Sequence, residues 1–569
     1  MTTSAVDEKT KLFNAIFREQ WLNFVNKHPA LPPIISTESF TEVLMDELAD
    51  IPHISDPSNG NSKAKGSGFV GPCSYQVVRF DGKVRFLEFP HPWPYAKLGK
   101  ALIDNWDTLG QFCDTEESLL RPRFDSNSSR IIAFNYGDRE DEWLSALDEA
   151  APFANGRSSF DEPRVLALDI ANFFPSIYTH ALDWAISKGR LNPGNPVGSS
   201  IDEAYRHVRN SRTDGVSIGP ITSNIAAEII LNELDKYLQD AKRNGKLDFR
   251  RHVDDVEILI PASTDPSELI GDISMILRKY SLTLNHTKQS YSTVFDFLAS
   301  DIGTIANQFL ETWREFPSRG KLKVFIAEIH QFSQKHQKMS LPRYLWPSLL
   351  TKAKEADLFY EFLVESMYLL PMHPELIQGY TQTIADSPEL IPRIATSRSV
   401  KKFLTKLFRD SLRIGSVEFT CWLIYLSELL ALDLSHVIRK FVQRVLIESG
   451  SESASQFPPS SKLNSSDAEA LRNQMSPILA VCLLHYSYEL ENYNSEVSKF
   501  TTDLRDLLRN TYTTSGNWKD QRMAEWSPEW PIRYELFRNG EIEISSLSAI
   551  EKKCFAIMNK HKFRLLAHP

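Results

Sequence analysis

The stretch that decides the fold lies between residues 165 and 177 and reads VLALDIANFFPSI. An apolar run ends at Asp169, and an aromatic pair and Pro175 follow, which predicts a buried strand that stops at a carboxylate. A carboxylate at the end of a strand lies at the edge of a sheet, where its oxygens can bind a metal ion. The alternative is that Asp169 caps the following turn, which is the more common role of an isolated aspartate.

A second carboxylate signal occupies residues 249–260, which read FRRHVDDVEILI. Two apolar runs flank Asp254 and Asp255, and this pattern predicts a hairpin with both aspartates at its tip. Adjacent carboxylates repel each other and raise each other's pKa unless a cation neutralises them. We therefore expect Asp169, Asp254 and Asp255 to be catalytic and to bind two Mg²⁺ or Mn²⁺ ions for phosphoryl transfer. A plain polar turn is the alternative for Asp-Asp alone.

A glycine-rich loop and a helix lie between these two segments, in GVSIGPITSNIAAEIILNELDKYL, residues 215–238. Gly219 lets the backbone approach a nucleotide closely, and Ser223 and Asn224 stand in the first helical turn, where they can cap or hydrogen-bond. The order of strand, glycine loop, helix and Asp-Asp hairpin is the order that a polymerase palm requires.

The rest of the chain indicates three regions. Residues 1–70 are predicted to be a helical segment and a loop, residues 71–300 an α+β domain, and residues 301–569 an all-α domain of helical hairpins. Apolar residues recur at helical spacing within residues 1–50, namely Phe13, Ile16, Phe17, Trp21 and Phe24. Residues 75–80 and 83–89 alternate in polarity around Asp81-Gly82, which predicts a hairpin. Residues 448–467 are expected to be a linker or loop.

The net charge of −9 argues against a nucleic-acid partner only weakly, because basic groups need only line a groove. The basic residues nearest the predicted palm are either such a lining or a solvated surface: Arg206, Arg209, Arg212, Lys242, Arg243, Lys246, Arg250 and Arg251. Farther upstream, Arg121, Arg123 and Arg130 are candidates for contacts with dNTP phosphates, with surface salt bridges as the alternative.

The bulk composition favours a soluble, cytoplasmic protein with reduced thiols. Five scattered cysteines form no zinc-binding pattern, no apolar run approaches the length of a membrane span, and the first residues lack the pattern of a secretory signal.

Together these segments resemble the reverse transcriptases. Residues 165–177 and 215–231 are similar to two palm motifs of that family, His252-Val253-Asp254-Asp255 stands at its Tyr-x-Asp-Asp, and residues 282–288, LTLNHTK, are similar to a later palm segment. Residues 91–106 resemble the fingers. The resemblance implies a fingers-palm domain in which Phe174 excludes a 2′-hydroxyl and Asn285 and Lys288 place the triphosphate. The implied nucleotide-binding positions are Ile170, Phe174, Gly219, Asn285 and Lys288.

Two departures narrow the resemblance. His252 replaces the usual Tyr and Ile218 stands where many members have Gln, and with the long helical C-terminal region the chain looks most like bacterial abortive-infection reverse transcriptases of the AbiK kind. That likeness implies a HEAT-like C-terminal domain, homo-oligomers, a role in anti-phage defence, and DNA synthesis from dNTPs that is primed by a tyrosine and needs no template.

Two other hypotheses remain open. The first is a templated reverse transcriptase that uses an associated non-coding RNA. The second is an inactive palm that serves as a protein-binding scaffold, although such palms usually lose a carboxylate and all three are present here. A nucleotide cyclase is disfavoured, because the sequence has no Gly-Gly-Asp/Glu-Glu-Phe loop.

Overall fold

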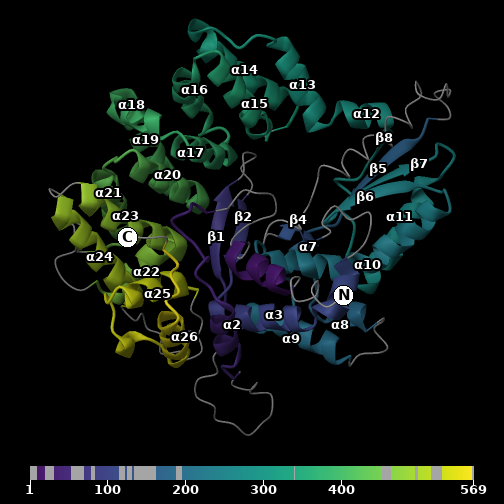
Figure 1. Ribbon diagram of the computed structural model, residues 1–569, viewed down its shortest axis with the longest axis horizontal. Helices are drawn as coiled ribbons and strands as arrows, with labels where there is room; N and C mark the ends of the chain where they lie inside the picture. Colours follow the sequence, from purple (N-terminus) through teal and green to yellow (C-terminus); the bar gives the residue numbers. More distant parts are fainter. Residues whose placement is uncertain are drawn as a thin grey trace.

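The computed structural model contains a small antiparallel palm sheet and an arch of helices that leaves the palm and returns to the N-terminal region (Figure 1). The structure describes residues 9–19, 31–52, 70–78, 84–113, 122–124, 131–133, 162–187, 195–338, 340–451, 463–493, 497–513 and 528–566.

The palm sheet has four strands in the order β6-β7-β5-β8, and every neighbouring pair is antiparallel. Its strands are β5 (Arg164–Asp169), β6 (Asp248–His252), β7 (Asp255–Ile260) and β8 (Ser290–Thr293). The helices of this region are α7 (Phe173–Ser176), α8 (His180–Ile186), α9 (Pro196–Val208), α10 (Ile221–Arg243) and α11 (Pro266–Lys279). The strand, helix and hairpin predicted for residues 165–260 are confirmed.

The long helix α10 contributes most to the core beneath the sheet. Both its apolar residues and several polar ones are buried, including Ser223, Asn224, Glu228 and Asp235. A helix buried nearly all round must satisfy its polar side chains within the protein. These residues therefore form the structural support of the carboxylate site described below.

Several other elements precede the palm sheet in the chain. They are η1 (Asn14–Glu19), α2 (Glu42–Ala49), β1 (Cys73–Val78), β2 (Val84–Phe89), α3 (Pro92–Asp104), α4 (Trp106–Cys113), β3 (Pro122–Phe124) and β4 (Ile131–Ala133). The expected hairpin is confirmed as β1 paired with β2 in the register Cys73↔Phe89, whereas Asp81-Gly82 lies outside the described residues.

The prediction of a helical segment over residues 1–50 is correct only in part. Phe13, Ile16 and Phe17 are buried within a helical segment, and Trp21 and Phe24 lie outside the described residues. Residues 32–41 are not helical but form turns and an isolated β-bridge. Two consecutive prolines at residues 32 and 33 explain this, because proline supplies no backbone N–H and restricts the preceding residue.

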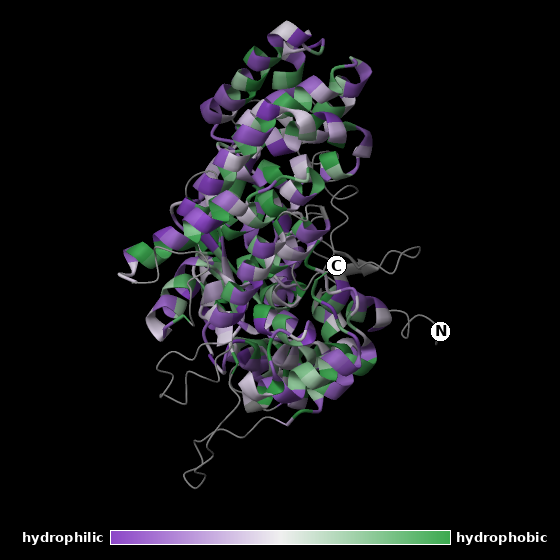
Figure 2. Cartoon of the chain, turned by 90° about the vertical axis from the view of Figure 1, so that its left-hand side faces the viewer, coloured by the Kyte–Doolittle hydropathy of each residue, from purple (hydrophilic) through white to green (hydrophobic). Residues whose placement is uncertain are grey.

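Helices account for the described elements after β8, as the sequence predicts. The α-helices are α12 (Val294–Ala299), α13 (Ile302–Thr312), α14 (Leu322–Lys335), α15 (Leu341–Glu355), α16 (Phe359–Ser366), α17 (Ile377–Ala385), α18 (Ile391–Thr396), α19 (Arg398–Ile414), α20 (Val417–Leu429), α21 (Ser435–Glu448), α22 (Ser465–Gln474), α23 (Pro477–Tyr493), α24 (Ser498–Thr513), α25 (Trp530–Arg538) and α26 (Ala549–Lys560). Short 3₁₀ turns at Arg319–Lys321, Met367–Leu369, Pro374–Leu376, Pro388–Leu390 and Ile544–Ser546 connect or extend them. Figure 2 shows green and purple residues alternating along these helices, as expected for helices that bury one face. Their HEAT-like character stays a prediction.

The end of the helical arch packs on the N-terminal region. Ile35 forms a β-bridge with Leu566, Phe40 packs edge-on against Phe563 at 5.6 Å between ring centroids, and Phe89 contacts Trp530 at 4.8 Å. We call residues 528–566 and their contacts with residues 31–51 and β2 the closing seam. Residues 301–569 therefore do not lie apart from residues 1–70, because the two ends of the chain share one packed interface.

No helix in the described part of the chain is both long enough and apolar enough to cross a membrane.

Candidate active site

The three predicted carboxylates come together at one end of the palm sheet. In the antiparallel pairing of β5 with β7, Asp169 stands directly opposite Asp255. Residues opposite each other in such a pair have Cβ atoms about 4.5–5.5 Å apart. Asp254 lies at the tip of the β6–β7 hairpin, and its carbonyl accepts a hydrogen bond of 3.2 Å from the Ile170 N–H. Asp169 and Asp255, which are 86 positions apart in the sequence, are thus neighbours.

The tip of this hairpin has an unfavourable backbone conformation. Val253 adopts a φ of 55°, in the left-handed region that β-branched residues rarely occupy. Val253 and Asp254 form the turn between His252 and Asp255, and these two residues are paired across the hairpin. Such a conformation persists only where surrounding contacts hold it.

Arg251 supplies these contacts from inside the protein. Its side chain is fully buried, and one of its Nη atoms donates to the Val253 carbonyl at 3.0 Å. The same guanidinium makes paired hydrogen bonds with Glu228 at 2.7 and 3.1 Å and with Asp235 at 2.7 Å for both bonds. Both carboxylates belong to α10, so Arg251 fastens the turn before Asp254 to the long helix.

Nearby cationic side chains neutralise the negative charge of Asp254 and Asp255 only in part. Burial raises the pKa of Asp254, and the charge of Asp169 adds to the increase, whereas Lys288 and Arg85 oppose it. Burial, and then repulsion from Asp254 and Asp169, raises the pKa of Asp255 to about 6. Asp255 is the most exposed of the three, so solvent screens part of this repulsion. A cation at this place would relieve it.

Asp169 differs because two side chains already hold it. Asn285 Nδ2 donates to one carboxylate oxygen at 2.9 Å, and the Lys288 ammonium lies 2.6 Å from the other. The backbone N–H of Asn285 also donates to the Asp169 carbonyl at 2.7 Å. The hydrogen bond to Asp169 raises the pKa of Lys288. The segment predicted to place a triphosphate therefore meets the first carboxylate directly.

The donor chemistry of this cluster fits a hard divalent cation, since it offers carboxylate oxygens with raised pKa values. The Lys288 ammonium already places a positive charge beside one of them. As the side chains stand, however, no three His, Cys, Asp or Glu residues among those described are spaced to hold one metal ion. Binding of an ion by Asp169, Asp254 and Asp255 would therefore require their side chains to move, and the ion would compete with Lys288 and Asn285 for the Asp169 carboxylate.

The two adjacent phenylalanines separate as expected. Phe173 is 3% exposed and belongs to the core, whereas Phe174 is half-buried, and their ring centroids are 5.4 Å apart. Phe174 is thus the one of the pair that keeps an accessible surface. Ile170 is buried and its N–H is bonded within the protein, so it faces the core.

The glycine loop packs against the β1–β2 hairpin. Gly219 has a φ of 133°, which disfavours any residue with a side chain, and an added Cβ would stand 3.4 Å from the Glu88 carbonyl. The Glu88 N–H donates to the Ile218 carbonyl at 2.8 Å. Ser223, at the start of α10, donates its hydroxyl to the Ser217 carbonyl. The loop therefore joins β2 to the long helix.

The basic residues that the sequence offers as a groove lining are mostly paired with acids instead. Arg209 binds Glu88, Arg250 binds Glu257, and Arg251 is buried. Ion pairs also join Arg206 to Asp202, Arg212 to Asp214, Lys242 to Asp248 and Arg243 to Asp240. The local pattern of positive charge therefore overstates the free charge, because carboxylates that neutralise part of it lie nearby in space.

The sequence did not indicate that two further residues support the carboxylate site. Arg251 appeared only as one of a run of basic residues, and Arg85, on β2, acts on the pKa of Asp254. The sequence signal for Arg251 was an arginine in a strand whose alternate residues are buried. The side chain of Arg123, and the whole of Arg121 and Arg130, lie outside the described residues.

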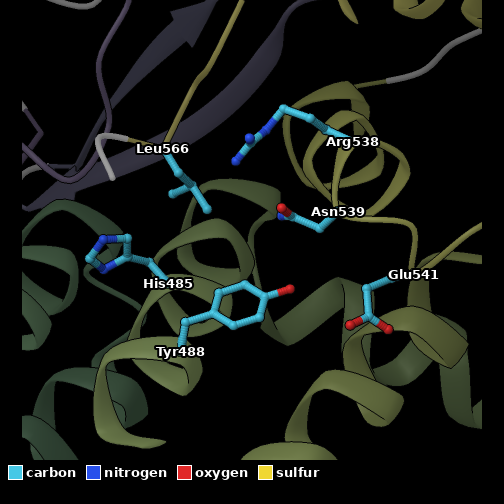
Figure 3. A pocket seen from close by; sticks show the side chains of 6 residues that line it. All are labelled: His485, Tyr488, Arg538, Asn539, Glu541 and Leu566. Atoms are coloured by element: carbon cyan, nitrogen blue, oxygen red, sulfur yellow. The ribbon is translucent and has the colours of Figure 1, made fainter. Parts of the chain in front are cut away.

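One cavity in the described part of the chain, of about 190 Å³, lies elsewhere (Figure 3). It is lined by residues of the closing seam and α23: His485, Tyr488, Arg538, Asn539, Glu541 and Leu566. It therefore does not belong to the carboxylate site.

No protein-family model matches the sequence, and no curated protein matches it. Among solved structures, telomerase from Candida tropicalis in complex with a fragment of telomeric RNA is 14% identical over 66% of this chain and 62% of that chain, with a TM-score of 0.29. Telomerase from Candida albicans in a similar complex is 14% identical over 64% of this chain and 67% of that one, with a TM-score of 0.27. A truncated apo telomerase from Candida tropicalis is 13% identical, with a TM-score of 0.28, and this chain spans 50% of its length. These values are too low to support an inference about this chain.

Proposed function

We propose that this chain is a nucleotidyltransferase of the reverse-transcriptase kind that joins dNTPs into DNA. The observation that carries the proposal is the pairing of Asp169 with Asp255 across β5 and β7, with Asp254 at the adjoining hairpin tip. Three acidic side chains, from segments that are far apart in sequence, meet at one end of the palm sheet. Burial and repulsion raise the pKa values of two of them. Stability alone does not explain such an arrangement, because it leaves like charges together.

Each residue has a proposed role in this reaction. Asp169, Asp254 and Asp255 would hold two Mg²⁺ or Mn²⁺ ions, and such ions would lower the pKa of the attacking hydroxyl and stabilise the leaving pyrophosphate. Lys288 and Asn285 orient Asp169, and the Lys288 ammonium stands where it can also meet a phosphate oxygen. Phe174, five residues after Asp169 in the sequence, would limit the space for a 2′-hydroxyl. Gly219 keeps the loop next to β2 free of a side chain.

The finer features of the proposal rest on the resemblance to abortive-infection reverse transcriptases. These features are a tyrosine primer, synthesis without a template, homo-oligomers and a role in anti-phage defence. A tyrosine oxygen can replace a 3′-hydroxyl as the attacking group, since both are hydroxyls that a metal ion can activate. The alternative is templated synthesis with an associated RNA.

The test uses the purified full chain with each dNTP and Mg²⁺ and no added nucleic acid. Products are separated on a denaturing gel before and after protease treatment. We expect DNA whose mobility increases after proteolysis, because it is attached to the protein. Incorporation only after RNA and a primer are added would instead support the templated alternative. No incorporation under any of these conditions, in a folded protein, would overturn the proposal and favour the scaffold hypothesis.

A further inference from the structure

Helix α19 (Arg398–Ile414) carries a stripe of positive charge on its exposed face. Its basic residues at positions 398, 402, 406, 409 and 413 are separated by four, four, three and four residues, so they lie on one side of the helix. All five side chains are exposed. At 1.5 Å per residue the stripe is about 22 Å long. We call Arg398, Lys402, Lys406, Arg409 and Arg413 the basic stripe.

Acidic side chains neutralise little of the charge of the basic stripe. Within the part of the chain that the structure describes, its one ion pair is the exposed contact of Arg409 with the adjacent Asp410 at 3.4 Å. Elsewhere, surface lysines have acidic partners, as in Lys100 with Asp46 at 2.7 Å and Lys560 with Glu47 at 2.8 Å. In a chain with a net charge of −9, an unneutralised stripe is a local exception. Such a concentration of positive charge attracts polyanions.

An aromatic pair borders the basic stripe. Phe403, on the same helix, is half-buried, and Tyr368 packs edge-on against it at 5.0 Å between ring centroids. Tyr368 is 50% exposed, so part of its ring is accessible to a ligand. Exposed aromatic rings beside a row of cations are the combination that binds unpaired bases and their phosphates together.

We propose that the basic stripe and Tyr368 form a binding surface for single-stranded nucleic acid on the helical arch. The cations contact successive phosphates, and the Tyr368 ring stacks on a base. A duplex fits less well, because its bases are already stacked inside the helix and offer no face to the tyrosine. The strand that we assign to this surface is the single-stranded DNA that the proposed polymerase synthesises, so the inference goes beyond the proposed function and rests on it only for the source of that strand.

The first experiment measures binding of fluorescent 20-nucleotide oligo-dT and oligo-rU to the full chain at several salt concentrations. The background carries Asp254→Asn and Asp255→Asn, so that incorporation cannot occur during the measurement. The test variant adds Lys402→Glu, Lys406→Glu and Arg413→Glu. The matched control adds Lys323→Glu, Lys335→Glu and Lys553→Glu, which are exposed lysines on α14 and α26 and change the net charge equally.

We expect the stripe variant to raise the Kd at least tenfold and the control to change it less than about threefold. The dependence of log Kd on log salt should also become shallower by roughly 2, because each lost contact with a single strand contributes about 0.7. Equal weakening in both variants would show a general charge effect and overturn the proposal, as would a parent protein that binds neither oligonucleotide at low salt. Oligo-dT should bind at least as tightly as oligo-rU, as expected for the DNA product, whereas clearly tighter binding of oligo-rU would overturn the assignment to that product.

A second variant isolates the aromatic contribution. Tyr368→Ala should raise the Kd for oligo-dT by about 5- to 50-fold, the effect of losing one stacked base, while the salt dependence stays unchanged. Tyr368→Phe should retain binding, since it keeps the ring. Loss of binding in both variants would contradict stacking. Because binding is measured without catalysis, a failed polymerase assay and a failed binding assay remain distinguishable.

Discussion

The palm site and the closing seam both place carboxylates where burial opposes their charge. The groups around them shift the carboxyl pKa values in opposite directions. At the palm, burial and repulsion raise the pKa values of Asp254 and Asp255. At the seam, burial also opposes the charge on Glu551, yet hydrogen bonds and attraction from Arg533 lower its pKa to about 2. Arg533 Nε lies 2.6 Å from this carboxylate, and the Ser548 N–H donates to it at 2.8 Å. A carboxylate with its partners built in stabilises the fold, whereas carboxylates that share too few cations are suited to bind a ligand.

The largest expected effect comes from the palm. Replacing Asp254 and Asp255 by Asn should reduce dNTP incorporation by about 10³-fold or more, since a metal ion supplies several kcal/mol to such a reaction. The thermal unfolding midpoint should not fall, because the substitution removes repulsion. Incorporation is measured with labelled dNTP and unfolding by circular dichroism. Full activity in the double variant would break the comparison.

Arg251 links the two kinds of charge, since it neutralises buried acids directly beneath the palm site. Arg251→Met should lower the free energy of unfolding by about 3–5 kcal/mol, because Glu228 and Asp235 then lose their buried cation. Urea unfolding followed by fluorescence measures this change. The triple variant that adds Glu228→Gln and Asp235→Asn should recover most of the stability. A stable single variant would mean that the buried acids do not depend on this arginine.

At the closing seam we expect the reverse of the palm result. Glu551→Gln should lower stability at pH 7 by about 3 kcal/mol, the equivalent of a pKa lowered from 4.5 to about 2. A lowered carboxyl pKa contributes stability above pH 4.5 that is lost as the pH falls towards 2. Parent and variant should therefore converge in stability across that window. A difference that stays constant down to pH 2 would show that the effect does not depend on this charge.

A smaller effect on stability should distinguish Gly219, in the glycine loop, from a glycine in open space. Gly219→Ala should destabilise the protein by about 1–2 kcal/mol and reduce incorporation, because alanine disfavours a φ of 133°. Gly271, in helix α11, has open space around its Cβ position, and Gly271→Ala should stabilise by about 0.5–1 kcal/mol. Thermal unfolding of both variants measures the contrast. Equal effects would show that the loop tolerates a side chain.

Local pattern determined much of the palm in advance. The strand that ends at Asp169, the helix after the glycine loop and the hairpin at Asp254 follow from hydrophobic periodicity and turn chemistry, which act over a few residues. The order of these segments also indicated that their carboxylates meet. The helical nature of residues 301–569 was equally readable, because amphipathic spacing extends along each helix.

Tertiary structure decided which charges are neutralised and where the chain ends meet. The sequence left the arginines near the palm as either a groove lining or a charged surface, whereas the structure pairs Arg209 with Glu88 and Arg251 with Glu228 and Asp235. Likewise, no periodicity relates Ile35 to Leu566, which form a β-bridge. The physical reason is the same in both cases. Hydrophobic pattern and propensity are properties of neighbouring residues, whereas the partner of a charge, or of a strand edge, is set by packing between segments far apart in the sequence.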